Sequence, residues 1–207
     1  MSHAVSLFDS SAVMLEPWAE AGYQCWAVDI THPRGHTFRD DGINLIGHDL
    51  TTPWLPPFAR SEIVFVAAFP PCDHLAVSGA RWFKGKGLRA LASSIELFAT
   101  AAEFCEWSGA SYMIENPVST ISTYWRKPDH AFSPHQYAGW EPSDNYTKKT
   151  CLWVGGGFVM PKPFLLEGAG EPDDRIHKMP PSAQRAAMRS QTPRGFARAA
   201  FRANRGY

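Results

Sequence analysis

The stretch "SEIVFVAAFPPC" (61–72) joins an apolar run to two prolines and a cysteine. An apolar run without polar alternation is typical of a strand that is buried on both faces, as in a parallel sheet. Pro70 and Pro71 end this strand, because their rings fix the backbone and remove two amide donors. The sequence therefore predicts a core strand that presents Cys72 in a rigid position at its carboxyl end.

The rest of the chain alternates strand patterns with helix patterns. The helix pattern at 87–109 has an apolar face that runs from Leu91 to Cys105, and it ends at Gly109. Over 207 residues this alternation predicts a single α/β domain with a largely parallel sheet and flanking helices. We expect further strands at 4–10, 23–30, 42–50, 110–117 and 148–156, a shorter helix at 11–22 and an arginine-rich helix near the end.

The cysteines and the apolar runs indicate the surroundings of the protein. Cys25, Cys72, Cys105 and Cys151 lie far apart and form no CxxC pair, so we expect neither a metal site nor a disulfide framework. No run approaches the roughly 18 apolar residues of a membrane span, and no signal peptide is visible. We therefore expect a reduced, cytoplasmic setting with no metal and no membrane partner.

Basic residues are concentrated near the end of the chain. Residues 175–207 contain eight Arg or Lys and no Asp or Glu, whereas residues 1–174 contain twelve basic and twenty acidic residues. One interpretation is a surface that binds a polyanion such as nucleic acid. The other is a solvated arginine-rich helix whose charges complement the acidic remainder of the domain.

Polar residues follow most of the expected strands. Ligands of parallel α/β sheets bind beyond the carboxyl ends of the strands, so these residues are expected to share one crevice. Asp29 is placed to accept hydrogen bonds from ribose hydroxyls, and Asp49 could contact an adenine amino group. Each aspartate is also a common helix-cap or turn residue, and that alternative stays open. The residues at the strand ends are Asp9, Ser10, Asp29, Asp49, Cys72, Glu115 and Asn116.

Two of these residues suggest a reaction. A thiol that is held at a strand end can become a thiolate nucleophile, whereas a buried thiol stays inert. Glu115 stands in a crevice beside Pro117, where a carboxyl can have a raised pKa and donate a proton. A cysteine nucleophile and a carboxyl that protonates a ring nitrogen are what is needed to activate carbon 6 and then carbon 5 of a pyrimidine. His74 is a helper or a turn residue.

These features together resemble the DNA cytosine-5 methyltransferase family. "FPPC" (69–72) and "IENP" (114–117) resemble its two catalytic motifs. "TKKTCLW" (147–153) and "HKMPPS" (177–182) look closest to short phage-type methylase-like proteins that lack a large target-recognition domain. The remaining matches follow the family's order and are "LFDSSA" (7–12), "AVDI" (27–30), "HDL" (48–50), "TKKTCLWVGG" (147–156) and "RSQTPRGFARAA" (189–200).

The resemblance implies a Rossmann-like fold of the S-adenosylmethionine-dependent methyltransferases, formed by a single domain over residues 1–207. Residues 1–156 would be the catalytic core. A short Pro- and Gly-rich segment, 157–180, would replace the recognition domain, and a basic helix within 181–207 would close the cofactor site. The resemblance also implies the cytoplasm of a bacterium or of a phage-infected host, and DNA as the partner.

The resemblance assigns a role to each motif residue. Cys72 would attack carbon 6 of cytosine, Glu115 would hold ring nitrogen 3, and Lys149 falls at one of the family's two arginine positions on its strand. A methyl group from S-adenosyl-L-methionine, or another group from a modified derivative, would go to carbon 5. The implied substrate-binding residues are Pro71, Ser78, Arg81 and Lys148. The implied cofactor-binding residues are Phe8, Asp9, Ser10, Ser11, Asp29, Ile30, Asp49, Leu50, Pro70 and Asn116.

The chain departs from the family pattern at three places. "FDSSAV" (8–13) contains no glycine, although nucleotide-binding turns usually need them for close backbone approach. Cys151 stands at the family's second arginine position, for which Arg81 or Lys148 could substitute. Only about 30 residues separate the sixth expected strand from the terminal motif, too few for an element that enters the major groove.

We therefore expect a minimal cytosine-5 modifying enzyme that acts on DNA with relaxed sequence specificity. Its basic terminal segment would contact phosphates, which give affinity without sequence information. One alternative is an enzyme on the same scaffold that modifies free pyrimidine nucleotides and needs no recognition domain. The other is an inactive relative that binds DNA or a partner protein.

Overall fold

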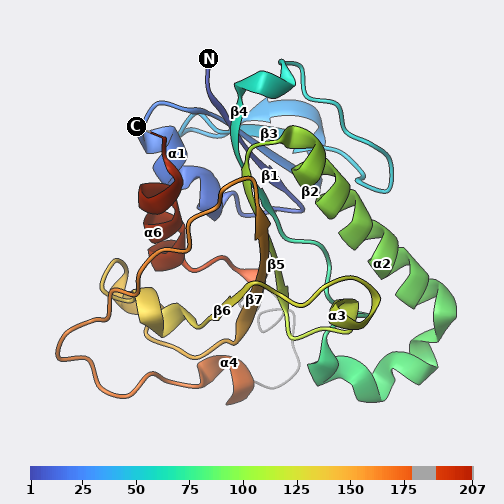
Figure 1. Ribbon diagram of the computed structural model, residues 1–207, viewed down its shortest axis with the longest axis vertical. Coiled ribbons are helices and arrows are strands. Elements are labelled where there is room, and N and C mark those ends of the chain that lie inside the picture. Colours follow the sequence, from blue (N-terminus) through green and yellow to red (C-terminus); the bar gives the residue numbers. More distant parts are fainter. Residues whose placement is uncertain (179–189, 207) are drawn as a thin grey trace.

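Seven strands form one sheet in the order β3-β2-β1-β4-β5-β7-β6 (Figure 1). The computed structural model describes residues 1–178 and 190–206. Strands β1 to β5 run parallel, apart from the last residues of β2, and β7 is antiparallel to both β5 and β6. Chain order reverses between β1 and β4, which is where such sheets bind ligands. The strands are β1 His3–Leu7, β2 Gln24–Phe38, β3 Asn44–Gly47, β4 Ile63–Ala68, β5 Ser111–Pro117, β6 His130–Phe132 and β7 Thr150–Gly155.

Helices cover both faces of the sheet. Helices α1 and α6 lie on one face, and α2 and α3 lie on the other (Figure 1). The helices are α1 Glu16–Glu20, α2 Phe83–Ser108, α3 Ile121–Tyr124, α4 Arg175–Lys178 and α6 Arg194–Asn204. The 3-10 turns are Val13–Leu15, Arg60–Glu62, Val77–Trp82, Pro134–Tyr137 and Pro142–Asp144.

Strand β4 shows why the opening stretch is apolar throughout. Phe65 belongs to the core on the α1 and α6 face, where its ring stacks on Trp18 at 4.6 Å between centroids. Val66 belongs to the core on the α2 face, which also contains Phe98 and Trp153. Successive residues of β4 therefore enter opposite cores, as expected for a central strand of a parallel sheet. The predicted single-domain, Rossmann-like α/β fold with a largely parallel sheet is confirmed.

The helices differ from the prediction at their starts. The pattern at 11–22 forms a 3-10 turn followed by the five residues of α1, with Pro17 in its first turn. Helix α2 begins at Phe83, four residues before the expected start, and Gly87 interrupts it with φ 80° and ψ 170°. Gly109 ends α2 in the left-handed conformation, with φ 68°, which agrees with the predicted stop.

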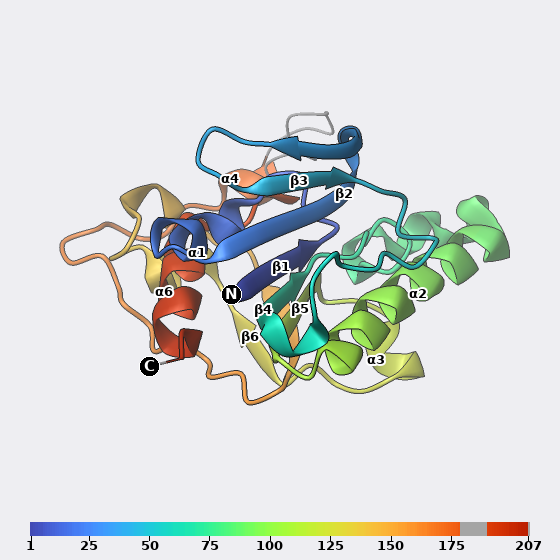
Figure 2. The ribbon, with the colours of Figure 1, turned by 90° about the horizontal axis from the view of Figure 1, so that it is seen from above.

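Strand β2 is longer than the expected strand at 23–30. Its first part pairs in parallel with β3, and residues 34–38 then pair with the same residues of β3 in the reverse order. This return segment lies on the other side of β3 (Figure 2). The turn passes so close to Gly47 that an added Cβ would lie 2.1 Å from the carbonyl oxygen of Pro33. The expected third strand, 42–50, is accordingly limited to β3.

Strand β6 was not predicted, because three residues are too short for a period-two pattern. The arginine-rich helix was expected over 182–203. Its second half forms helix α6, Arg194–Asn204, residues 191–193 are not helical, and 182–189 lie outside the described residues. Residues 179–189, which include most of "HKMPPS", lie outside the described residues. The division at 156/157 and 180/181 stays a prediction. Among the described helices, none is long and apolar enough to cross a membrane.

Candidate active site

The carboxyl ends of β1, β2, β4 and β5 meet at one edge of the sheet, because these strands are parallel neighbours. This edge therefore collects the residues that follow each strand: the Asp9 turn, the Asp29 turn, the Cys72 turn and Glu115. The predicted grouping of these segments thus follows from the observed strand order.

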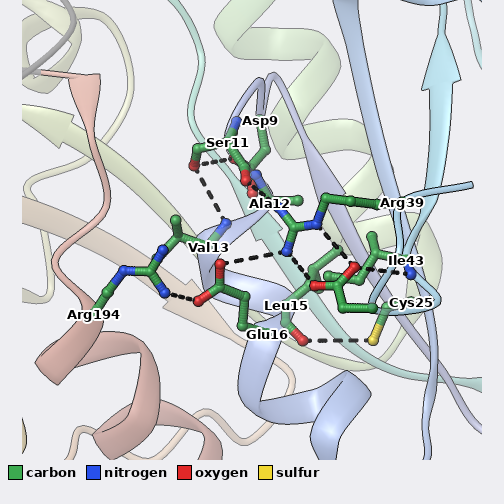
Figure 3. Close-up of polar contacts among 11 residues, drawn as sticks. Asp9, Ser11, Ala12, Val13, Leu15, Glu16, Cys25, Arg39, Ile43 and Arg194 are labelled. Carbon is green, nitrogen blue, oxygen red and sulfur yellow. Dashed lines mark hydrogen bonds and ion pairs between the residues drawn. The ribbon is translucent and has the colours of Figure 1, made fainter.

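The turn after β1 is built around the Asp9 carboxylate. Its Oδ1 atom accepts hydrogen bonds from the Ser11 amide at 3.1 Å, the Ser11 hydroxyl at 2.9 Å and the Ala12 amide at 2.8 Å (Figure 3). Phe8 and Ala12 both have φ 55°, the left-handed conformation that favours glycine. The turn therefore adopts a glycine-like backbone without glycine, at a cost of about 1–2 kcal/mol per residue.

The second carboxylate oxygen of Asp9 can accept a further hydrogen bond. Asp9 is 3% exposed, and its Oδ2 atom has no hydrogen-bond partner among the described residues. Burial raises the pKa of this carboxyl, although hydrogen bonds from Ser11 and Ala12 and the nearby Ser6 hydroxyl oppose the rise. A buried acceptor without a partner is costly, so it needs a donor: the buried Ser6 hydroxyl, which also lacks a partner among the described residues, or an ammonium or hydroxyl group of a ligand.

Three charged residues fasten the terminal helix to this turn. Glu16 forms ion pairs with Arg194 of α6 and with Arg39, whose Nη2 lies 3.4 Å from Glu16 Oε1 (Figure 3). Arg39 Nη1 also donates to the carbonyl oxygen of Ser11 at 2.7 Å. These contacts hold the segments around residues 11–16, 39 and 194 together. Sequence reasoning missed Glu16, Arg39 and Arg194, because nothing in the sequence pairs residues so far apart.

The start of α6 is held by a buried carboxylate from another segment. Asp144 Oδ2 accepts a hydrogen bond from the Gly195 amide at 2.7 Å. Burial raises the pKa of Asp144 to about 6. An added Cβ on Gly195 would lie 2.4 Å from the carbonyl oxygen of Tyr137, so only glycine permits this close approach. Asp144 was also missed, since its role depends on tertiary contact.

Asp29 and Asp49 each bind their own turn. Asp29 Oδ1 accepts hydrogen bonds from the amide of Thr31 at 2.8 Å and from its hydroxyl at 2.6 Å. Asp49 is exposed, and its Oδ1 atom accepts from the Thr51 amide at 3.0 Å, which lowers the pKa of Asp49. These contacts are those of turn residues, the alternative raised by the sequence. Each carboxylate still has a second oxygen, so a role in binding the cofactor stays a prediction.

The turns after β4 and β5 are joined by hydrogen bonds. Asn116, which is 1% exposed, donates from Nδ2 to the carbonyl oxygen of Pro70 at 2.9 Å. The Val77 amide donates to the Val118 carbonyl at 2.9 Å. Between these two contacts lies the half-exposed Cys72. The predicted nucleophile and the strand end that carries Glu115 are therefore adjacent.

Glu115 faces Lys148 rather than Lys149. The Lys148 Nζ atom lies 3.9 Å from Glu115 Oε1, and the two side chains are 13% and 18% exposed. Burial raises the pKa of Glu115, and the charge of Lys148 opposes this rise. Lys149 is exposed; both lysines lie in the irregular segment that precedes β7. Lys148 thus has the position expected of a group that assists Glu115.

A small cavity lies between this edge of the sheet and the start of α6. Glu115, Lys148 and Thr150 line it from the sheet, together with Phe69 after β4 and Thr192 before α6. Its walls thus combine the predicted proton donor with a residue of the terminal motif. Its volume of about 10 Å³ holds no more than about one water molecule, so it is not a formed ligand site.

The remaining predicted residues lie around this edge. Ser10, Ile30 and Pro71 are exposed, whereas Leu50 is buried in the core on the α2 face. Ser78 and Arg81 are exposed in the 3-10 turn Val77–Trp82, which follows the Cys72 turn. Neither residue is part of the lining of the small cavity beside Glu115, and their assignment to the substrate stays a prediction.

The described basic residues of the terminal segment mostly contact other parts of the protein. Arg175, Lys178, Arg194 and Arg198 form ion pairs with Asp173, Asp174, Glu16 and Glu141, respectively. The guanidinium of Arg202 lies 4.4 Å from the centre of the Trp140 ring, and that of Arg205 lies 5.5 Å from the Phe201 ring. These contacts favour the second interpretation, a helix that complements the acidic part of the domain. Arg185 and Arg189 lie outside the described residues.

Comparisons with known proteins find distant structural likeness. No family model matches the chain, and no curated protein matches it. Among solved structures, a prophage-encoded protein of E. coli, described as a candidate DNA modification methyltransferase, matches with a TM-score of 0.49 and 14% sequence identity. The match covers 75% of this chain and 46% of that chain, so this chain spans about half the length of its neighbour.

Proposed function

We propose that this protein modifies carbon 5 of cytosine in DNA through a covalent adduct with Cys72. The proposal rests on one observation above all: the Asn116 side chain holds the Cys72 turn against the strand end that carries Glu115. A half-exposed thiol thereby lies beside a largely buried carboxyl whose pKa is raised. A nucleophile next to a proton donor is what attack on carbon 6 of a pyrimidine needs.

Each group has a defined task in the proposed reaction. The Cys72 thiolate forms a bond with carbon 6 while Glu115, in its protonated form, donates its proton to ring nitrogen 3, so that electron density reaches carbon 5. After group transfer, carbon 5 loses its proton to a base, the carbon–sulfur bond breaks so that the Cys72 thiolate leaves, and ring nitrogen 3 returns its proton to Glu115. Lys148 stabilises the Glu115 carboxylate that remains once the proton has moved.

S-adenosyl-L-methionine, or a modified derivative, would supply the methyl or related group. The turn after β1 fits such a ligand, because the buried Asp9 Oδ2 atom lacks a partner among the described residues and could accept from an ammonium group. Asp29 and Asp49 would contact the sugar and the base. Arg39 and Arg194 would keep this turn in place through Glu16.

Covalent trapping tests the proposal. We expect wild-type protein and cofactor to form an adduct with DNA that contains 5-fluorocytosine, because fluorine at carbon 5 cannot leave as a proton would. Denaturing electrophoresis and mass spectrometry would detect the adduct. Cys72→Ala should abolish it, whereas Cys105→Ala should not, since Cys105 is fully buried and its pKa is raised by burial.

Other outcomes would contradict the proposal in distinct ways. If no DNA adduct forms but dCMP or dCTP is modified, the substrate is a free nucleotide. If no substrate is trapped and no cofactor binding is found by calorimetry, the protein is an inactive relative. Nucleoside mass spectrometry of expressing cells would give the mass of the transferred group.

A further inference from the structure

A second cavity lies beside the Cys72 turn and is not used by the reaction described above. It is a groove of about 370 Å³ between that turn and the start of α2. Phe83, Leu88 and Leu91 give it apolar walls, and Lys84 and Lys86 stand among them. This volume lies within the roughly 300–1,000 Å³ of small-ligand sites.

The groove adjoins the proposed nucleophile directly. His74, two residues after Cys72, forms part of its lining. Lys86 Nζ donates to the carbonyl oxygen of Asp73 at 2.7 Å, so this amine lies over the Cys72 turn. The interruption of α2 at Gly87 turns the first residues of the helix away from its remainder (Figure 1). Lys84 and Lys86, which lie in this first part, both line the groove.

The charges of the groove are available to a ligand. The chain has no acidic residue between Asp73 and Glu96, and it has four basic ones there. Within residues 1–178 and 190–206, no ion pair involves Lys84 or Lys86. The terminal segment differs, since most of its described cations contact carboxylates or rings. The groove therefore offers two lysines beside the Cys72 turn that form no ion pair among the described residues.

We propose that the groove binds the nucleotide that flanks the target cytosine in single-stranded DNA. The apolar walls would take the face of an unstacked base, and Lys84 and Lys86 would contact its phosphates. A paired and stacked base could not enter such a groove, so the occupant is an unpaired strand. Trp82, which is 60% exposed, stands next to the groove as a further surface for a base. The inference rests on the proposed function, because the nucleotide assigned to the groove is the one next to the cytosine that Cys72 would attack.

Binding measurements separate this inference from catalysis. The affinity of the Cys72→Ala protein for a labelled single-stranded oligonucleotide would be followed by fluorescence anisotropy at several salt concentrations. Lys84→Gln with Lys86→Gln should weaken binding roughly tenfold at low salt and reduce the slope of log affinity against log salt by about 1.4. Phe83→Leu should weaken binding at least about fivefold and leave that slope unchanged, because it removes a stacking surface and no charge.

The matched control removes the same charge elsewhere. Lys127 and Lys162 are exposed and form no ion pair among the described residues, so Lys127→Gln with Lys162→Gln should bind like the parent protein. Thermal unfolding would verify that every variant is folded. Equal affinities and slopes for the two double variants would overturn the inference, as would duplex DNA that binds as tightly as the single strand. Failure of covalent trapping with the binding results as expected would refute the proposed function, and the groove would then be a single-strand site without a target cytosine beside it.

Discussion

Replacing Asp144 with asparagine should make the anchoring of α6 independent of pH. Asp144 is 6% exposed, and it accepts the Gly195 amide at the start of the helix. Burial raises the pKa of its carboxyl from 3.8 to about 6. Asparagine keeps an oxygen that can accept the same hydrogen bond, but it carries no charge at any pH.

The direction of the effect follows from proton binding. A carboxyl with a raised pKa binds its proton more tightly in the folded protein than in the unfolded chain. Its contribution to stability is complete below the unfolded pKa and is lost as the pH rises through the folded pKa. The difference between 3.8 and about 6 corresponds to about 3 kcal/mol as an upper bound. Between pH 4 and 7.5 the wild type should therefore lose about 1–3 kcal/mol relative to Asp144→Asn.

Urea unfolding at pH 4, 5.5 and 7.5, followed by tryptophan fluorescence, would measure these differences. Asp144→Ala serves as a control, because it leaves the buried Gly195 amide unpaired and should cost about 1–3 kcal/mol, with its disadvantage smallest at high pH. A wild type that gains stability over Asp144→Asn as the pH rises would refute this reasoning. That result would mean that the partial positive charge at the start of α6 outweighs the cost of burying the carboxylate.

Two further substitutions test the turns around the site. Asn116→Ala removes the hydrogen bond to the Pro70 carbonyl and should lower the free energy of unfolding by about 1–3 kcal/mol. The covalent trapping of DNA by Cys72 should also become slower. An unchanged trapping rate would show that this hydrogen bond does not position the thiol. Gly47→Ala should cost at least about 2 kcal/mol in thermal unfolding, because its Cβ would overlap the Pro33 carbonyl. Gly35→Ala, with open space but φ 90°, should cost only about 1–2 kcal/mol, and equal losses would contradict the overlap.

The sequence was sufficient for those parts of the fold that local patterns determine. The apolar run before Cys72 predicted β4, and the apolar face from Leu91 to Cys105 with the stop at Gly109 predicted most of α2. The return of residues 34–38 along β3 could not be foreseen, because it depends on pairing with a strand that comes later in the chain.

The site was predictable to a similar extent. Cys72, Glu115 and Asn116 could be placed from the sequence, because each lies at or just after the end of a strand that the sequence predicts. The choice between Lys148 and Lys149 was beyond the sequence, because both lie in an irregular segment before β7, where side-chain direction follows no period. The pair of Glu16 and Arg194 was likewise hidden, because 178 positions separate them.

The return segment that follows β2 has a consequence for association between molecules. Without it, β3 would be the outermost strand and would offer unpaired amides and carbonyls to another chain, which is the usual origin of aggregation through sheet edges. Residues 34–38 occupy those groups instead. The new border is short and preceded by Pro33, and it contains Gly35 in a left-handed conformation, so it is a poor template for an incoming strand. The same turn that reshapes the end of β2 thereby protects the protein from self-association at this edge.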